Sequence, residues 1–311
     1  PPRDRTEARV AWLPASPGVG SPSLKRTRLL SPLHPWSITE RAAPVGRKRA
    51  RSAPASPLRE DLPRVRRTYD CQLDVVYGPA EDQKLDVFPA PKPGAHVVVY
   101  MHGGAWTRSD KSIESFMGEG FIRAGAAFVA VNFSLCPKVS LDELIRQARQ
   151  AVAWAYRNAA TFNGDPDRFY IAGHSSGGHV GGMMVVTDWS KVTGLPRKLI
   201  KGALLCSGMY DLVPVKLSAR NDYLKLDDAA VQRNSSILQV PDTGCPLVIG
   251  YGGDEHKEFR RQSRNFAAAW RARGLSVEEY EMPGVNHFAL RRHFNNPDSP
   301  IFKAMLKLMS L

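Results

Sequence analysis

The feature that most constrains the fold of this chain is a series of short apolar segments that alternate with amphipathic segments from about residue 67 onward. Continuous apolar runs such as HVVVYM (96–101) and AAFVAVNF (126–133) are typical of strands buried on both faces of a parallel sheet. The segment 140–160 instead has apolar residues at the helical period, with Ser140 and Glu143 placed as a capping box at its start. This alternation predicts an α/β fold, a mostly parallel central sheet with helices on both faces.

The other elements are predicted from the same two patterns. Further strands are expected at 71–78, 83–90, 168–173, 201–211, 246–253 and 276–284, and further helices at 110–124, 255–274 and 299–310, with one more opening at Ser176. The first two strands alternate in polarity, so we expect antiparallel pairing at the N-terminal edge. Residues 212–241 are the one long insertion between core strands. We expect them to form a small cap over the functional site, and the sequence leaves open whether it closes as a lid.

The N-terminal part of the chain differs in composition from the rest. The 311 residues carry a formal net charge of +13, and residues 1–60 hold 12 Lys and Arg against 4 Asp and Glu, together with 10 of the 24 prolines. Such a segment buries too little apolar surface to order itself. We therefore predict a disordered basic tail at 1–66 and one α/β domain at 67–311. The run GRKRAR (46–51) leaves open a nuclear signal or nucleic-acid patch, and the composition leaves open a transit peptide.

The cysteines and the hydropathy of the chain indicate the cellular compartment and limit the kinds of partner that we expect. The four cysteines are scattered without a C-x-x-C pair, which favours free thiols in a reducing compartment over a zinc site or disulfide framework. No apolar run approaches the roughly 18 residues that a membrane-spanning helix requires. We expect a cytoplasmic protein without a metal site or a membrane partner. Nucleic acid is not an expected partner because the excess charge lies in the tail, and a homodimer is left open.

The stretch RFYIAGHSSGGH (168–179) runs an apolar strand into a serine flanked by glycines and then directly into a helix. Gly173 and Gly177 leave room for a sharp, strained turn that projects the oxygen of Ser175 above the sheet, which is the nucleophile elbow G-x-S-x-G. The alternative is a Gly/Ser-rich turn without chemistry. Residues elsewhere in the sequence distinguish the nucleophile elbow from a turn without chemistry.

Two residues at later strand ends support the elbow. Asp254 and His287 each follow a predicted strand, which gives the chain order Ser, Asp, His of α/β-hydrolases. Taken singly, each has an ordinary structural explanation, but together they predict a triad of Ser175, Asp254 and His287. The stretch GGDEHKEF also offers Glu255 and Glu258. Asp254 lies nearest the strand end and is our choice. Glu258 is the fallback, although a carboxylate at this place on a helix more commonly caps it or pairs with an arginine.

The motif HGGAW (102–106) follows the strand 96–101 directly. Glycines let backbone N–H groups approach a developing oxyanion, so we expect Gly103 and Gly104 to form an oxyanion hole with the N–H of Ser176. We expect His102 to organise this loop through a hydrogen bond rather than to act as a base. Trp106 either faces the substrate pocket or packs beneath it.

The body of the chain resembles α/β-hydrolases of the hormone-sensitive-lipase-like branch and, more specifically, the serine-type arylformamidases (kynurenine formamidases). The resemblance covers about residues 67–311 and rests on YGPAEDQKLDVFPA (77–90), HGGAW (102–106), GDPDRFYIAGHSSGGH (164–179), SGMYDL (207–212), DDAAVQRNSS (227–236), EFRRQSRNFAAAW (258–270) and NHF (286–288). Within these, QRNS and EFRRQS discriminate most, because general esterases share the elbow and the HGG loop.

The resemblance implies cofactor-free hydrolysis of N-formyl-L-kynurenine to kynurenine and formate, through a formyl-enzyme on Ser175 with His287 as base and then acid. A formyl group is the smallest acyl group, so the site needs a tight acyl side and an aromatic-lined leaving-group side. Candidates for this lining are Trp106, Phe133, Tyr210 and Phe288, and each is equally explained as a core residue.

Two alternatives to the arylformamidase hypothesis are kept. One is a carboxylesterase acting on short-chain acyl or aryl esters, since the same machinery cleaves both bonds. The other is a ligand-binding homologue that has lost catalysis. The retained Ser, Asp and His argue against that second alternative.

Overall fold

A computed structural model describes residues 64–311, and these contain an eight-stranded sheet. Its strands are β1 (Gln72–Val76), β2 (Lys84–Phe88), β3 (Ala95–Met101), β4 (Ala127–Val131), β5 (Gly164–His174), β6 (Gly202–Cys206), β7 (Leu247–Gly252) and β8 (Val277–Met282). The strand order is β1-β2-β4-β3-β5-β6-β7-β8. β2 pairs antiparallel with β1 and with β4, and the remaining pairs are parallel. The predicted strands and the antiparallel N-terminal edge are therefore confirmed, except that the strand expected at 201–211 ends at Cys206.

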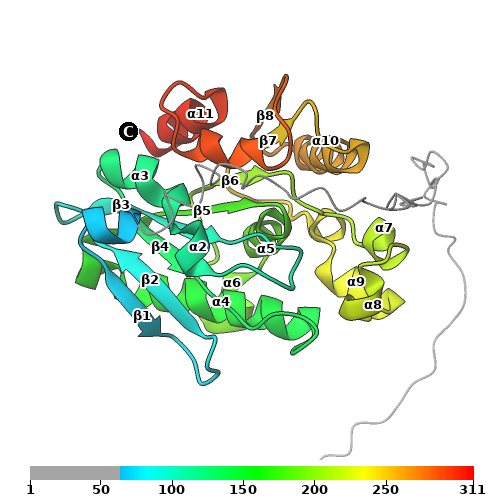
Figure 1. The fold of residues 1–311 in the computed structure, drawn as a ribbon, viewed down its shortest axis with the longest axis horizontal. Coiled ribbons are helices and arrows are strands. Elements are labelled where there is room, and N and C mark those ends of the chain that lie inside the picture. The colour runs from blue at the N-terminus through cyan, green and yellow to red at the C-terminus, as the bar shows by residue number, and fades with distance from the viewer. Residues whose placement is uncertain (1–63) are drawn as a thin grey trace, which may run out of the picture. The chain divides into compact units, whose positions relative to one another are not determined.

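Helices cover both faces of this sheet. The described helices and 3-10 turns (η) after the helical residues 64–68 are α2 (Lys111–Glu114), η1 (Ser115–Gly118), α3 (Glu119–Arg123), α4 (Leu141–Asn158), η2 (Ala159–Phe162), α5 (Ser176–Val185), α6 (Trp189–Thr193), α7 (Val213–Lys216), α8 (Asn221–Leu224), α9 (Asp228–Asn234), η3 (Ser236–Gln239), α10 (Lys257–Ala272), η4 (Ala289–Phe294) and α11 (Pro300–Met309). α3 and α11 lie on one side of the sheet, and α4 and α6 on the other (Figure 1). None of the described helices is long and apolar enough to cross a membrane.

The apolar runs of the central strands follow from this layering. In β3, Val97 and Val99 pack into the core beneath α4, α5 and α10, whereas Val98 and Tyr100 pack into the core beneath α3 and α11. Successive side chains of a strand point to opposite faces, so a strand covered on both sides needs apolar residues throughout. This packing confirms the α/β class that the sequence predicted.

The segment 110–124 is not the single helix that we expected, because it divides into α2, η1 and α3. At Gly118, in η1, the backbone lies so close to the sheet that a Cβ would stand 2.3 Å from the ring of Phe128. Close packing of this backbone against β4 therefore replaces a regular helix.

The capping box predicted at the start of α4 is only half formed. Ser140 Oγ accepts from the N–H of Glu143, but the Glu143 side chain binds Arg146 and does not return to the N–H of Ser140.

The insertion 212–241 forms α7, α8, α9 and η3, which Figure 1 shows grouped at one side of the sheet. Two side chains of the body hold its ends. The Oε1 atom of Gln262 accepts from the N–H of Asp211, 2.8 Å away. The carboxylate of Asp142 accepts from Arg233 at 2.8 Å and from Asn234 at 2.9 Å. The motifs QRNS and EFRRQS thus supply the contacts that anchor this insertion.

The folded body begins slightly before residue 67, where we placed its start. Val65 is fully buried against the core on the α3 side, and Arg66 donates to Asp86. Residues 64–66, which we placed in the tail, are described together with the body, and residues 1–63 of the expected tail lie outside the described residues. Asp86 is fully buried and also binds Lys111 of α2 at 3.0 Å and the N–H of Asp74 at 3.0 Å.

We expect Asp86→Asn to lower the free energy of unfolding by about 3 kcal/mol, because it removes the buried carboxylate that Lys111 and Arg66 share. Asp82→Asn is the matched control, since the ion pair of Asp82 with Lys138 is largely exposed and should contribute less than about 1 kcal/mol. Urea unfolding of both variants measures the difference. Equal losses of unfolding free energy in the two variants would contradict a larger contribution of the buried Asp86.

Candidate active site

Ser175 lies at the junction of β5 and α5 in a strained backbone conformation. Its φ is 59° and its ψ is −127°, a region that costs a non-glycine residue about 1–3 kcal/mol. Two backbone hydrogen bonds hold the turn: the Ser175 N–H donates to the carbonyl of Cys206 at 2.9 Å, and its carbonyl accepts from the N–H of His179 at 3.1 Å. The strand-turn-helix geometry of an elbow is therefore present.

The glycines around the elbow allow three backbones to approach closely. A Cβ on Gly173 would stand 2.3 Å from the carbonyl oxygen of Gly177, and a Cβ on Gly177 would stand 2.0 Å from that of Met101. Met101 ends β3, immediately before the HGG loop. The same glycines that permit the turn therefore place the serine beside that loop.

His287 and Glu255 complete a hydrogen-bonded chain behind Ser175. His287 Nε2 lies 2.9 Å from Ser175 Oγ, and His287 Nδ1 lies 3.2 Å from Glu255 Oε2. With Nδ1 donating to the carboxylate, Nε2 is left as an acceptor for the serine hydroxyl. This arrangement can deprotonate the hydroxyl and stabilise the imidazolium that results.

The acid position corrects the sequence prediction. Asp254 is exposed, and it is Glu255, one residue later, whose side chain is fully buried against His287. The sharp turn after β7 directs residue 255 inward, since its carboxylate folds back to accept from the N–H of Gly252 at 2.9 Å. Glu258, the fallback, pairs with Arg261 on α10.

The carboxylate of Glu255 has a second partner that sequence reasoning missed. Ser207 Oγ donates to Glu255 Oε1 at 2.6 Å, and Ser207 itself is fully buried just after β6. Both lone-pair directions of Oε1 are thus used, by Ser207 and by Gly252, while Oε2 faces His287. The signal was available, because Ser207 is also a polar residue at the carboxyl end of a core strand.

The ring of His287 packs against two other rings. Phe259 of α10 lies 4.2 Å away in a stacked arrangement, and His174 lies 4.6 Å away, tilted by 40°. Burial holds the pKa of His174 well below its ordinary value, and the charges of His287 and Arg291 lower it further. His174 is therefore neutral where the site works, so it supports the ring of His287 without adding a charge.

The HGG loop lies against the nucleophile. A Cβ on Gly103 would stand 3.4 Å from Ser175 Cβ, and Gly104 has a φ of 106°, which favours glycine. Among the described residues, no hydrogen-bond acceptor is paired with the N–H of Gly103 or Gly104. Ser176 opens α5, so its N–H has no acceptor within the helix. The structure thus brings together the three residues that we expected to form an oxyanion hole.

His102 and Ser176 fix the shape of this loop. His102 Nδ1 lies 2.8 Å from the carbonyl oxygen of Gly103, and donation to this oxygen orients the planar peptide whose other end is the Gly104 N–H. Burial lowers the pKa of His102, which favours the neutral ring. The Ser176 hydroxyl accepts from the N–H of Trp106 at 3.3 Å. His102 therefore lies where a loop-organising residue should.

Trp106 is linked through His179 to the insertion. Trp106 Nε1 donates to His179 Nδ1 at 3.1 Å, and His179 Nε2 lies 2.8 Å from the carbonyl oxygen of Asn234. His179 must be neutral, with its proton on Nε2, to make both bonds. Burial lowers its pKa from 6.5 to about 4, which agrees with this state. The chain Trp106–His179–Asn234 thus joins the HGG loop to the end of α9.

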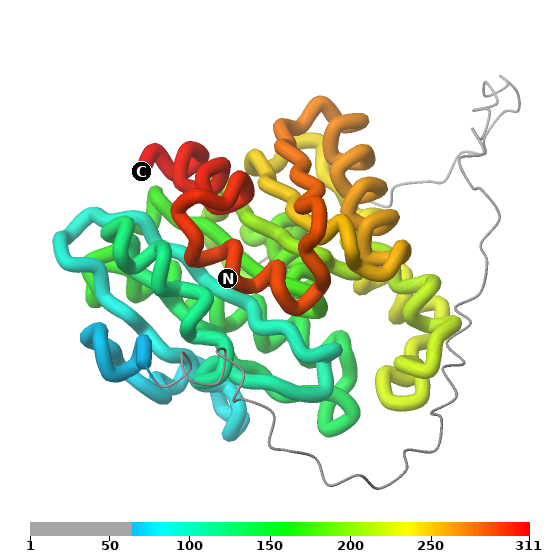
Figure 2. The backbone as a smooth tube through the Cα atoms, turned by 45° about the horizontal axis from the view of Figure 1, so that its top comes forward, coloured from blue at the N-terminus to red at the C-terminus, as the bar shows by residue number. Residues whose placement is uncertain are grey.

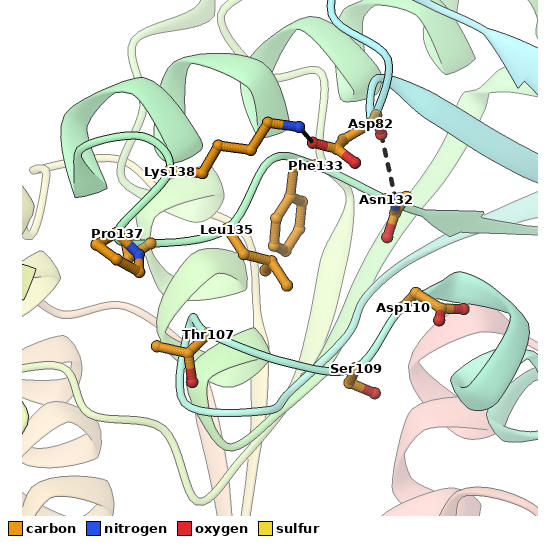
Figure 3. A pocket seen from close by; sticks show the side chains of 10 residues that line it. Asp82, Thr107, Ser109, Asp110, Asn132, Phe133, Leu135, Pro137 and Lys138 are labelled. Carbon is orange, nitrogen blue, oxygen red and sulfur yellow. Dashed lines mark hydrogen bonds and ion pairs between the residues drawn. The ribbon is translucent and has the colours of Figure 1, made fainter. Parts of the chain in front are cut away.

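A cavity of about 330 Å³ adjoins the HGG loop at Thr107 (Figure 3). It lies between the segments 107–110 and 132–138, and the Asp82–Lys138 ion pair borders it at one end. Phe133, whose ring stacks on His102 at 4.5 Å, belongs to the lining. The rest of the lining consists of Ser109, Asp110, Asn132, Leu135, Cys136 and Pro137.

The other expected lining residues take different places. Trp106 is 1% exposed and bound to His179, and Tyr210 is fully buried with its ring stacked on Phe266 at 4.3 Å. Both are core residues, which is the second of the two alternatives that the sequence left open for them. Phe288 is 69% exposed and meets the ring of His287 edge-on at 5.6 Å. It therefore offers an uncovered aromatic surface beside the site.

Within residues 64–311, no group of three or more His, Cys, Asp or Glu side chains has the arrangement of a metal site. All four cysteines are free.

The parallel sheet, the elbow and the Ser-His-carboxylate chain at the carboxyl ends of its strands define an α/β-hydrolase. The family described as BD-FAE matches residues 85–202. The chain is 31% identical to kynurenine formamidase of Danio rerio over 264 residues, which is 83% of this chain and 88% of that protein. It is 32% identical to kynurenine formamidase of Salmo salar over 260 residues, or 81% and 86% of the two chains.

The chain therefore belongs to the kynurenine formamidase family, within the hormone-sensitive-lipase-like hydrolases that its motifs resemble, and it is a hydrolase of the α/β type. An esterase of Pyrobaculum calidifontis shares the fold, with a TM-score of 0.67 and 16% identity over 81% of this chain and 90% of that chain.

The depressed pKa of His179 predicts a pH-dependent stability. Its contribution is complete above the unfolded value of 6.5 and is lost as the pH falls from 6.5 toward 4, because only the unfolded chain then binds the proton. The loss should reach about 2 kcal/mol at about pH 5.

We expect the urea unfolding free energy to fall less between about pH 7.5 and pH 5 in His179→Gln than in the unmodified protein. The glutamine amide can accept from Trp106 and donate to Asn234 without titrating. Parallel pH dependences in the two proteins would contradict the assignment.

Proposed function

We propose that this protein hydrolyses an aryl formamide, N-formyl-L-kynurenine, to kynurenine and formate, with Ser175, His287 and Glu255 as the catalytic triad. The single observation that carries the mechanism is the 2.9 Å contact of His287 Nε2 with Ser175 Oγ, backed by Glu255 on Nδ1. The identity with two proteins named kynurenine formamidase supports the choice of substrate. The free thiols support the cytoplasmic location expected from the sequence.

The reaction runs in two half-reactions. His287 Nε2 takes the proton of Ser175 Oγ as the oxygen attacks the formyl carbon, and the N–H groups of Gly103, Gly104 and Ser176 bind the oxyanion. His287 then gives this proton to the departing aryl amine, which leaves a formyl ester on Ser175. Water, deprotonated by the same histidine, attacks that ester, and formate leaves as Ser175 regains its proton.

One feature beside the triad supports an aromatic leaving group. Phe288 is 69% exposed and meets the ring of His287 edge-on. An aromatic leaving group gains by packing against such a ring. Hydrolysis of short-chain acyl or aryl esters is the second candidate function, because the same triad and oxyanion hole cleave an ester.

The first test compares the unmodified protein with Ser175→Ala on N-formyl-L-kynurenine and on a short-chain nitrophenyl ester. We expect formamide turnover that falls by at least about 10³-fold in the variant, since the nucleophile is lost. Release of kynurenine, followed by its absorbance, gives the rate. Serine-dependent ester cleavage without formamide cleavage would favour the carboxylesterase, and the absence of both would contradict the mechanism.

The second test separates the two neighbouring carboxylates. Glu255→Gln should lower kcat by about 10³-fold or more, because an amide no longer holds the His287 tautomer and does not stabilise the imidazolium. Asp254→Asn is the matched control, and we expect its kcat to stay within about twofold because Asp254 is exposed and away from the ring. Steady-state kinetics on the same substrate decide, and the reverse pattern would restore Asp254 as the acid.

A further inference from the structure

The two loops that must meet at Ser175 come from distant parts of the chain. The HGG loop leads through Ser109 into α2, and the loop of His287 leads into η4. In Figure 2 the chain after β8, in red, returns across the molecule toward the segment that holds α2 and η1. Contacts of Asn295 with Gly120 and with the carbonyl of Phe116 confirm that these segments lie side by side.

One buried carboxylate contacts both loops. Glu114, the last residue of α2, is 4% exposed. Its Oε1 atom accepts from Arg291 Nη1 at 2.7 Å and from Ser109 Oγ at 3.2 Å, and its Oε2 atom accepts from the Tyr100 hydroxyl at 3.3 Å. Ser109 lies three residues after the HGGAW motif, Arg291 four residues after His287, and Tyr100 in β3.

We propose that Glu114 is a positioning residue that fixes the position of the HGG loop relative to the His287 loop. It acts on the reaction only through these two loops. This inference rests on the proposed hydrolytic mechanism and extends it. It assigns no contact between Glu114 and the substrate.

On the histidine side, two further contacts connect Arg291 with its surroundings and close the turn of His287. The guanidinium of Arg291 lies over the ring of Phe116, with 5.6 Å from its central carbon to the ring centroid. A hydrogen bond of 3.1 Å from the Leu290 N–H to the Asn286 carbonyl closes the turn that contains His287. Arg291 thus directly follows the closed turn that holds His287, which couples its position to that of the His287 ring.

The helix that carries Glu114 is fixed at its other end. Asp110 caps α2 by accepting from the N–H of Ser112 at 2.6 Å. Lys111 binds Asp86 at 3.0 Å and Asp74 at 2.6 Å. These contacts tie α2 to the edge of the sheet, so its carboxylate can serve as a common reference for both loops.

A purely structural ion pair would show the same contacts, so the test needs a readout that stability alone does not move. Glu114→Asp keeps the charge but withdraws the carboxylate by one methylene group. Glu119→Asp is the matched control. Glu119 is a buried carboxylate on α3 that binds Arg64 and lies 3.5 Å from the Tyr69 hydroxyl. None of the recorded Glu119 contacts is with residues 102–110 or 286–291, which form the two site loops.

The measurements are kcat and KM on a short-chain nitrophenyl ester, the rate at which a fluorophosphonate labels Ser175, and Tm. We expect Glu114→Asp to lower kcat and the labelling rate about tenfold with KM within about twofold, because a shift of a fraction of an ångström misaligns the reacting groups. Glu119→Asp should lower Tm and leave both rates within about twofold. Equal rates in these two variants would overturn the inference.

Ser109→Ala supplies the second arm. Alone it should slow ester turnover about threefold, and in the Glu114→Asp background it should have no further effect, since both changes act through the same carboxylate. Effects that multiply would show independent roles and would overturn the inference. Phosphonate labelling needs only the triad and the oxyanion hole. If the unmodified protein is labelled but does not hydrolyse N-formyl-L-kynurenine, the result contradicts the proposed substrate. The role of Glu114 is then still decided by the labelling and ester rates of the variants.

Discussion

The close approach of three backbones at Gly173, Gly177 and Met101 is the constraint on which the rest of the site depends. No side chain fits between these strands and the start of α5, so the turn at Ser175 is forced into its strained conformation and cannot relax into a longer loop. The same contact sets where β3 ends, and so where the HGG loop begins. This one close contact thus positions both the nucleophile and the oxyanion donors, and hydrogen bonds then fix their orientation.

Buried polar groups make these hydrogen bonds, and two of them, Glu255 and His179, use all their hydrogen-bonding atoms. Glu255 divides its two oxygens between His287 on one side and Ser207 with Gly252 on the other. His179 uses both ring nitrogens, one toward Trp106 and one toward the insertion. Satisfied polar groups in a low-dielectric interior specify one arrangement, because any shift leaves a donor or acceptor unpaired. The site therefore obtains its precision from its surroundings more than from the triad itself.

Sequence patterns predicted the strands, the elbow, the oxyanion loop and His287, because each is encoded by residues that are adjacent in the chain. The carboxylate that contacts His287 was expected one residue too early in the chain. Proximity to the strand end favoured Asp254, whereas the direction of Glu255 depends on a turn geometry that neither residue encodes. The sequence left open whether Trp106 and Tyr210 line the pocket or belong to the core, because the residue type of an aromatic near a site does not show which way its ring faces. The link through Glu114 spans α2 and η4, and no local pattern reports such a distant pairing.

The anchoring of the insertion has a consequence for how this scaffold can change. Its two ends are pinned by Gln262 on α10 and Asp142 on α4, helices that also belong to the core. The segment between the pins, including α7 and α8, touches the triad through no recorded bond of the described residues. The insertion is therefore joined to the helices of the core at two short contacts, so a change in the length of the segment between them need not move α4 or α10.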